Sequence, residues 1–154
     1  MHFIWLDYKN IYNLKKALIK NVNLIFSYIL KRKNGMTIEE CYVKMGANYQ
    51  DVIKRLPSAK MIEKFALKFK DDTSFQELET ALNEKQVELA FRAAHTLKGV
   101  CMNLGFDHLY KPSFEITESL RAGNLELGLQ QFGAVKEQYT KTIDALNEFA
   151  LENE

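Results

Sequence analysis

The sequence predicts an all-α fold, an antiparallel up-down four-helix bundle with additional N-terminal helices. The 154 residues include seven Gly and two Pro, and long segments are rich in Leu, Ala, Glu and Lys, which favour helices. Apolar residues recur every three or four positions, as on one face of a helix, instead of alternating as in strands. Short turns separate these segments, and long helices joined by short turns pack as antiparallel neighbours. The length suits one domain with an ordinary core.

The first predicted helix covers residues 7–31. Its apolar stripe consists of Ile11, Leu14, Leu18, Val22, Ile25 and Ile29. The basic residues 31–33 suit the negative pole at a helix C-terminus. Asn34 and Gly35 can adopt the left-handed conformation that ends a helix, which places a boundary at Gly35.

Charge divides the chain at the same boundary. Residues 1–35 contain seven Lys or Arg against Asp7 alone, whereas the remainder contains fourteen against nineteen acids. We therefore predict a basic amphipathic N-terminal helix or extension over residues 1–35 and a helical bundle domain over residues 36–154. Nucleic acid is not expected as a partner, because affinity for it rests mostly on clustered Lys and Arg, and the main domain is acidic.

Short helices are expected at the start of the second part. Thr37 and Glu40 have the spacing of a capping box, and Gly46 can end the helix that they begin. A second short helix is expected over residues 49–56, and Ser58, after a proline, begins the next. The apolar face of that helix is expected to consist of Met61, Ile62, Phe65, Ala66 and Phe69.

The bundle helices are expected around Phe75 to Leu82, over residues 86–104 and 106–122, and after Asn124, which can cap the last helix. Gly105 and Gly123 are expected to end the second and third of these helices. Pro112 removes a backbone donor and clashes with the previous turn, which predicts a kink or a restart within the third helix. Apolar residues of the last helix are Phe132, Val135, Tyr139, Ile143, Leu146 and Phe149.

Two cysteines, Cys41 and Cys101, are too few for a disulfide scaffold, and we expect both to be reduced thiols. No segment reaches the run of about 18 or more apolar residues that a membrane span requires. The N-terminus lacks a compact apolar region followed by a small-residue cleavage site. We therefore expect a cytoplasmic protein.

The most informative residue is His95. At about 100° per residue, a set of apolar residues lies within about 60° of the point opposite this histidine. The set is Ala90, Ala93, Leu97, Val100, Cys101 and Leu104. His95 is therefore predicted to face solvent. Its own side of the helix carries Glu88, Phe91, Arg92, Lys98, Gly99 and Met102. Charged residues, a glycine without a side chain and the apolar residues Phe91 and Met102 surround His95. This mixture indicates a reactive imidazole inside a docking surface.

Residues 94–105 contain a further pattern, formed by His95, Leu97, Lys98, Gly99, Asn103, Leu104 and Gly105. This pattern closely resembles the signature of histidine-containing phosphotransfer (HPt) domains. The resemblance extends more loosely over residues 36–150, including residues 36–46 and 61–69, and residues 1–35 fall outside it.

The resemblance implies a phosphoprotein of a two-component phosphorelay. His95 would accept a phosphoryl group from a phospho-aspartate on one receiver domain and pass it to an aspartate on another. The implied partners are receiver domains of hybrid sensor kinases and response regulators. Members of the family do not use ATP, so no kinase activity is expected. We expect no metal or other cofactor in this chain and Mg²⁺ on the receiver. One exposed site needs no second copy, which predicts a monomer.

Each residue type suits this chemistry. Neutral imidazole is a competent nucleophile near pH 7. Lys98 lies on the same face and can place its ammonium beside the phosphoryl oxygens. Gly99 costs about 1 kcal/mol of helix propensity relative to Ala, and clearance for a receiver would explain it. The residues expected to contact the partner are Glu88, Phe91, Arg92 and Met102.

An alternative function and the role of residues 1–35 stay open at this point. The chain could be a helical adaptor that binds a receiver or kinase domain without carrying phosphate. Residues 1–35 have three interpretations: a helix that makes weak contact with an anionic membrane surface, a packing element on the bundle, or an extension that precedes a start at Met36.

Other polar residues receive structural interpretations. Asp71 and Asp72 are interpreted as helix-capping residues, because an acidic receiver pocket needs strands that this sequence lacks. A metal site formed by His95, Cys101, Asp107 and His108 fails because Cys101 lies more than about 100° around the helix from His95. His2 and His108 are expected to be ordinary surface residues.

Overall fold

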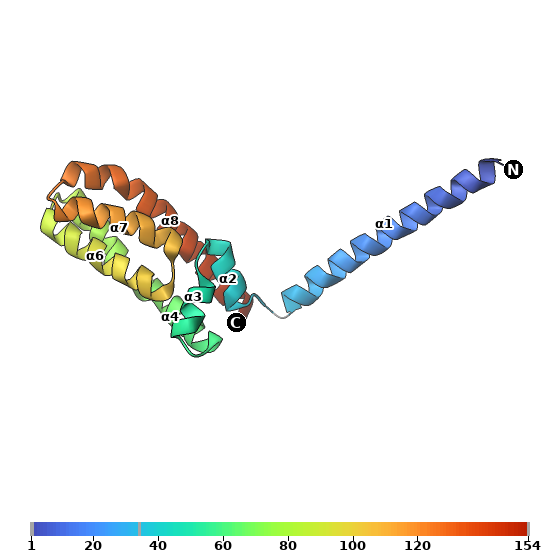
Figure 1. Cartoon of the computed structure of the whole chain (residues 1–154), viewed down its shortest axis with the longest axis horizontal. Coiled ribbons are helices and arrows are strands. Elements are labelled where there is room, and N and C mark those ends of the chain that lie inside the picture. Colours follow the sequence, from blue (N-terminus) through green and yellow to red (C-terminus); the bar gives the residue numbers. More distant parts are fainter. Residues whose placement is uncertain (1, 34, 154) are drawn as a thin grey trace. The chain divides into compact units, whose positions relative to one another are not determined.

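Helices form throughout the part of the chain that the computed structural model describes, residues 2–33 and 35–153, and no strand occurs there. The elements are α1 (His2–Lys33), α2 (Ile38–Met45), α3 (Tyr49–Arg55), α4 (Ala59–Lys68), the 3₁₀ turn η1 (Phe69–Asp71), α5 (Ser74–Asn83), α6 (Val87–Leu104), α7 (Asp107–Arg121) and α8 (Leu125–Asn153). The predicted all-α class is confirmed (Figure 1).

The described residues divide into two units, one ending at Met36 and the other beginning at Thr37. The first unit holds α1, whose described side chains, residues 11–26, are all exposed. Gly35 has a φ of 68°, the left-handed conformation expected at this boundary. Asn34 lies outside the described residues, as do the side chains of residues 1–10 and 27–33. Within the described part of the chain, no helix is long and apolar enough to cross a membrane.

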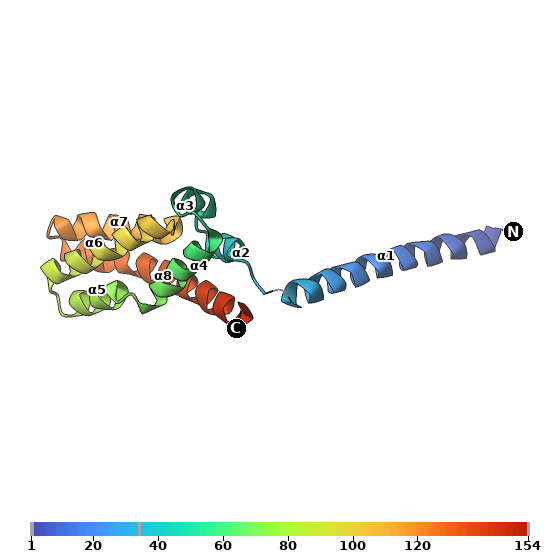
Figure 2. The same ribbon diagram turned by 90° about the horizontal axis from the view of Figure 1, so that it is seen from below.

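The second unit contains the predicted bundle, formed by α5, α6, α7 and α8 (Figure 2). The α6 helix packs against both α5 and α7. The α8 helix reaches α5 through Phe75 and Tyr139, whose stacked ring centroids lie 3.9 Å apart. It reaches α7 through His108 and Thr142, whose Nε2 and Oγ1 atoms lie 2.7 Å apart. Short connections make neighbouring helices antiparallel, as predicted.

Local signals mark the helix ends as expected. The side chain of Thr37 accepts from the backbone N–H of Glu40, and that of Glu40 accepts from the backbone N–H of Thr37, which completes the capping box of α2. Gly46 ends α2 with a φ of 82°. Ser58 caps α4, and Asp72 accepts a 3.0 Å hydrogen bond from the N–H of the residue that begins α5. The N-cap residue of α5 is Thr73 and Asp71 lies in η1, so the capping interpretation holds only for the bond that Asp72 accepts from the first N–H of α5.

Of the kink or restart predicted at Pro112, the restart does not occur, because α7 is one helix through this position. A proline in the second turn costs one backbone hydrogen bond, that to the carbonyl of the residue four positions earlier. The apolar face of α7 is buried before and after the proline, at Leu109 and Ile116. Packing of this face against the bundle keeps α7 continuous.

The assignment of His108 to the surface is also wrong. Its ring is half-buried beside Thr142 of α8. Burial, with the nearby charge of Lys141, lowers the pKa of His108 from its ordinary value of 6.5 to about 4. By contrast, Cys41 and Cys101 are free thiols, as expected, and both are buried.

Candidate functional site

The α6 helix presents His95 to solvent, as predicted. On its opposite side five of the six apolar residues are buried, namely Ala90, Ala93, Leu97, Cys101 and Leu104, and Val100 is half-buried. Gly105 ends the helix with a φ of 66°. A Cβ atom on this glycine would lie 2.3 Å from Val52 Cγ2, so close packing of α3 also requires glycine here.

The apolar groups beside His95 differ in exposure. The ring of Phe91 lies 5.9 Å from the imidazole, measured between centroids. Phe91 is only half-exposed, and the guanidinium carbon of Arg121 lies 5.5 Å from the centroid of its ring. Met102 is 54% exposed. The predicted exposure is therefore confirmed for Met102 and only partly so for Phe91.

Lys98 points toward α7. Its Nζ atom lies 4.0 Å from Glu118 Oε1 and 5.6 Å from the centroid of the Phe114 ring. The lysine side chain is only 16% exposed. In this structure the ammonium lies beside Glu118 and Phe114 of α7, a neighbourhood that the sequence did not predict.

Glu88 and Arg92 lie on the exposed face of α6, one to two turns before His95. Arg92 Nε donates a 3.1 Å hydrogen bond to Glu88 Oε1 within an ion pair. Exposed pairs of this kind contribute at most about 1 kcal/mol. Both charges therefore remain available to a partner.

Gly99 lies one turn beyond His95. A Cβ atom added to this glycine would meet no atom within 4 Å. The bundle itself therefore does not require glycine at this position, unlike at Gly105, and the space above residue 99 is open.

A groove of about 330 Å³ lies beside the C-terminal half of α6, between this helix and the α4–η1 segment. Its lining includes Phe65, Val100 and Asn103. The sequence assigned Phe65 and Met61 to the apolar face of α4, but they are 39% and 38% exposed. The apolar face of α4 includes more residues than α4 buries against its neighbours. The sequence alone does not show which of these residues stay exposed to solvent.

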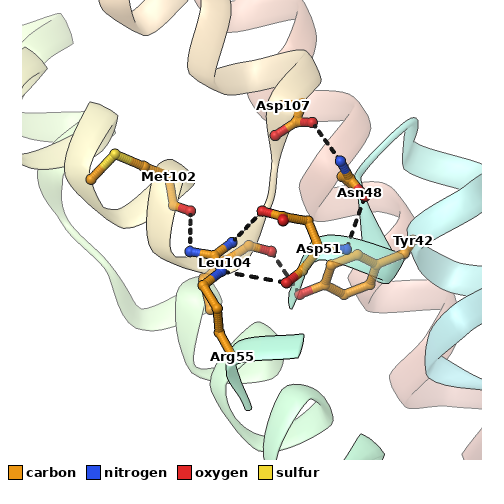
Figure 3. Close-up of polar contacts among 7 residues, drawn as sticks. All are labelled: Tyr42, Asn48, Asp51, Arg55, Met102, Leu104 and Asp107. Carbon is orange, nitrogen blue, oxygen red and sulfur yellow. Dashed lines mark hydrogen bonds and ion pairs between the residues drawn. The ribbon is translucent and has the colours of Figure 1, made fainter. Parts of the chain in front are cut away.

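The helices before the bundle hold the C-terminal end of α6 (Figure 3). The Tyr42 hydroxyl donates a 2.9 Å hydrogen bond to the carbonyl of Leu104. Arg55 Nη1 donates a 3.1 Å hydrogen bond to the carbonyl of Met102, while its Nη2 pairs with Asp51 at 3.1 Å. The last turn of a helix leaves carbonyl groups without intrahelical donors, and these side chains donate there; the Met102 carbonyl also accepts from the N–H of Gly105 at 3.4 Å. The α2 and α3 helices thereby help to position the exposed Met102.

The set of residues considered as metal ligands is not gathered at one site. His95 is exposed, whereas Cys101 is buried on the other side of α6. Burial raises the pKa of the Cys101 thiol, which keeps it protonated near neutral pH. The candidate site is thus centred on one imidazole, with Gly99, Lys98 and Met102 along the same helix.

The fold and the site define a helical-bundle protein with a solvent-exposed imidazole on α6. The family model described as "Hpt domain" matches residues 70–148, just over half of the chain, and the chain belongs to this family. No curated protein and no solved structure matches the sequence of this chain. The match begins at residue 70, so the looser resemblance noted over residues 36–46 and 61–69 lies outside it. Hpt domains are phosphocarrier modules that transfer phosphoryl groups on histidine in phosphorelays and interact with receiver domains of two-component systems.

Proposed function

We propose that this protein carries a phosphoryl group on His95 between two receiver domains, one of a hybrid sensor kinase and one of a response regulator. The observation that carries the proposal is the exposed imidazole on α6, next to open space at Gly99, within the residues matched by the family. An exposed nucleophile can enter the active site of another protein.

The transfer needs little from this chain. The lone pair of one ring nitrogen of His95 attacks phosphorus, and the bond between phosphorus and the donor carboxylate oxygen breaks. The electron pair of that bond returns to the aspartate. The reverse chemistry with a second receiver regenerates the free imidazole. We propose that Mg²⁺ belongs to the receiver, and that this chain acts as a monomer, without a cofactor or ATP-dependent kinase activity.

The partner would contact the face of α6 that surrounds His95. Met102 offers exposed apolar area, and Glu88 and Arg92 offer exposed charges of both signs. Phe91 contributes the exposed part of its ring. Apolar anchors surrounded by polar groups are typical of protein–protein interfaces.

The test is direct phosphotransfer. The chain is incubated with a phosphorylated receiver, and acid-labile, base-stable label is expected on it. His95→Gln should abolish that label, whereas His2→Gln and His108→Gln should retain it above pH 7. Label that persists in His95→Gln would remove His95 from the mechanism. A His95→Gln variant that still binds its partner and still signals would instead support the adaptor alternative.

We also propose that α1 lies weakly on an anionic membrane surface. Between residues 11 and 26 its large apolar side chains are exposed, and all its charged residues there are lysines. Basic amphipathic helices of this kind bind the interface of anionic bilayers. Flotation with anionic vesicles should retain the full chain but not a variant lacking residues 1–35, and neutral vesicles should retain neither. Equal retention of both chains would contradict this role.

A further inference from the structure

One carboxylate oxygen beside the site lies near two cations. Glu118 Oε1 on α7 lies 3.3 Å from Arg121 Nη2 and 4.0 Å from Lys98 Nζ. Lys98 follows His95 by three residues, so both project from one face of α6. The guanidinium of Arg121 covers the Phe91 ring, which itself contacts the imidazole of His95. Lys98 therefore lies one turn from the proposed phosphorylation site on α6, and Arg121 is linked to that site through the Phe91 ring.

These contacts are strong enough to orient the cations and weak enough to exchange. The side chains of Glu118 and Arg121 are 41% and 52% exposed, so solvent screens their attraction. The Lys98 contact is at the outer limit of an ion pair, and Glu118 shares its single charge between two partners. Lys98 also has a flexible four-carbon stem that can carry its ammonium to a new position.

A phosphoryl group on His95 would bring a larger negative charge to the same surface. Such a group carries about 1.5 to 2 negative charges near pH 7 and three acceptor oxygens. The single charge of Glu118 then competes with it for the same two cations. The stability of phosphorylated His95 therefore depends on both anions. A cation that moves from Glu118 to the phosphoryl group leaves the negative charge of Glu118 without its partner.

We infer that Glu118 is a positioning residue that competes with the phosphoryl group on His95 for Lys98 and Arg121. It thereby limits the stability of phosphorylated His95 and favours onward transfer. This inference rests on the proposed function of His95. A carrier benefits from such competition, because a group held too tightly would not be released to the second receiver.

The first experiment measures the equilibrium constant for transfer from a phosphorylated receiver to His95. Glu118→Gln removes the competing carboxylate charge from both cations and should raise this constant about two- to fivefold, the range expected for exposed ion pairs. Glu115→Gln is the matched control, because it removes the same charge one turn earlier on α7 from an exposed residue. An equal change in both variants would overturn the inference.

A double-mutant comparison separates this role from a structural one. In a chain carrying Lys98→Ala and Arg121→Gln, the additional change Glu118→Gln should leave the equilibrium constant unchanged. If Glu118 served only as an ion-pair link between α6 and α7, Glu118→Gln in the otherwise wild-type chain would alter thermal stability and leave the transfer equilibrium unchanged. An effect of Glu118→Gln that persists without the two cations would also overturn the inference.

A second measurement does not depend on receivers. Phosphoramidate can phosphorylate His95 chemically: its P–N bond breaks, ammonia leaves, and a new P–N bond forms at the imidazole. The side-chain carboxyl ¹³C signal of Glu118 should then shift as its cations leave, while that of Glu115 stays in place. No shift at Glu118 would refute the competition. If phosphorylated receivers do not label the wild-type chain, the proposed function is refuted. The ¹³C measurement still tests the competition, because phosphoramidate labels His95 without a receiver.

Discussion

Replacing Gly99 by alanine should stabilise the protein and impair its function. Gly99 lies in the interior of the eighteen-residue α6 helix, where alanine is favoured over glycine by about 1 kcal/mol. The new Cβ atom would meet no atom within 4 Å, so no clash offsets this gain. For a unit of this size, the midpoint of thermal unfolding should rise by about 3 to 6 °C.

The same methyl group would stand one turn from His95, on the surface that a receiver must approach. Displacement of reacting groups by about 1 Å can lower a rate about a hundredfold. We therefore expect Gly99→Ala to slow phosphotransfer from a receiver by about ten- to a hundredfold. Rapid-quench measurement of labelled His95 gives the rate, and circular dichroism gives the unfolding midpoint.

Gly133→Ala is the matched control. Gly133 lies in the α8 helix and also has open space where a Cβ atom would stand. This variant should gain similar stability and transfer at the wild-type rate. A Gly99→Ala variant that transfers normally would refute the clearance role, and one that is less stable than wild type would refute the reasoning about open space.

Three further predictions concern the fold around the site. Gly105→Ala should lower the free energy of unfolding by about 2 to 4 kcal/mol in urea titrations, because residue 105 has a φ of 66° and its Cβ would lie 2.3 Å from Val52; a near-neutral change would contradict this geometry. Tyr42→Phe should cost about 1 to 2 kcal/mol in the same titration, because the carbonyl of Leu104 loses its buried donor, and an unchanged stability would show that this bond contributes nothing. Burial lowers the pKa of His108 to about 4 in the folded chain. Between pH 6.5 and 4 the unfolded chain therefore binds more protons than the folded chain, and the free energy of unfolding declines as the pH falls. The neutral side chain of His108→Gln should weaken this pH dependence, and identical profiles would rule out His108 as its source.

Local signals in the sequence located most helix ends correctly. The capping box of Thr37 and Glu40 and the left-handed glycines at positions 46 and 105 act within a few residues, so tertiary contacts are not needed to identify them. The exposure of His95 followed from helical periodicity, because the opposite face of α6 is apolar. The family was likewise recognisable from the short pattern around this histidine.

The sequence did not predict features that depend on packing between helices. Pro112 predicted a kink or a restart because its local cost is large, and the restart is absent because burial of α7 on both sides of the proline keeps the helix continuous. His108 had no distinctive sequence context, yet its ring lies beside Thr142 on a different helix. Phe65 fitted an apolar stripe, but α4 buries only part of that stripe.

The sequence by itself determined the helices, most of their ends and the side of α6 on which His95 stands, because these depend on residues within one or two turns. Only the tertiary structure decided what surrounds the imidazole: the contact of Lys98 with Glu118, the position of Arg121 over Phe91 and the open space at Gly99. The physical reason is that the relative register and rotation of packed helices come from the fit of whole faces. No short pattern in one helix encodes which side chain of its neighbour will lie opposite.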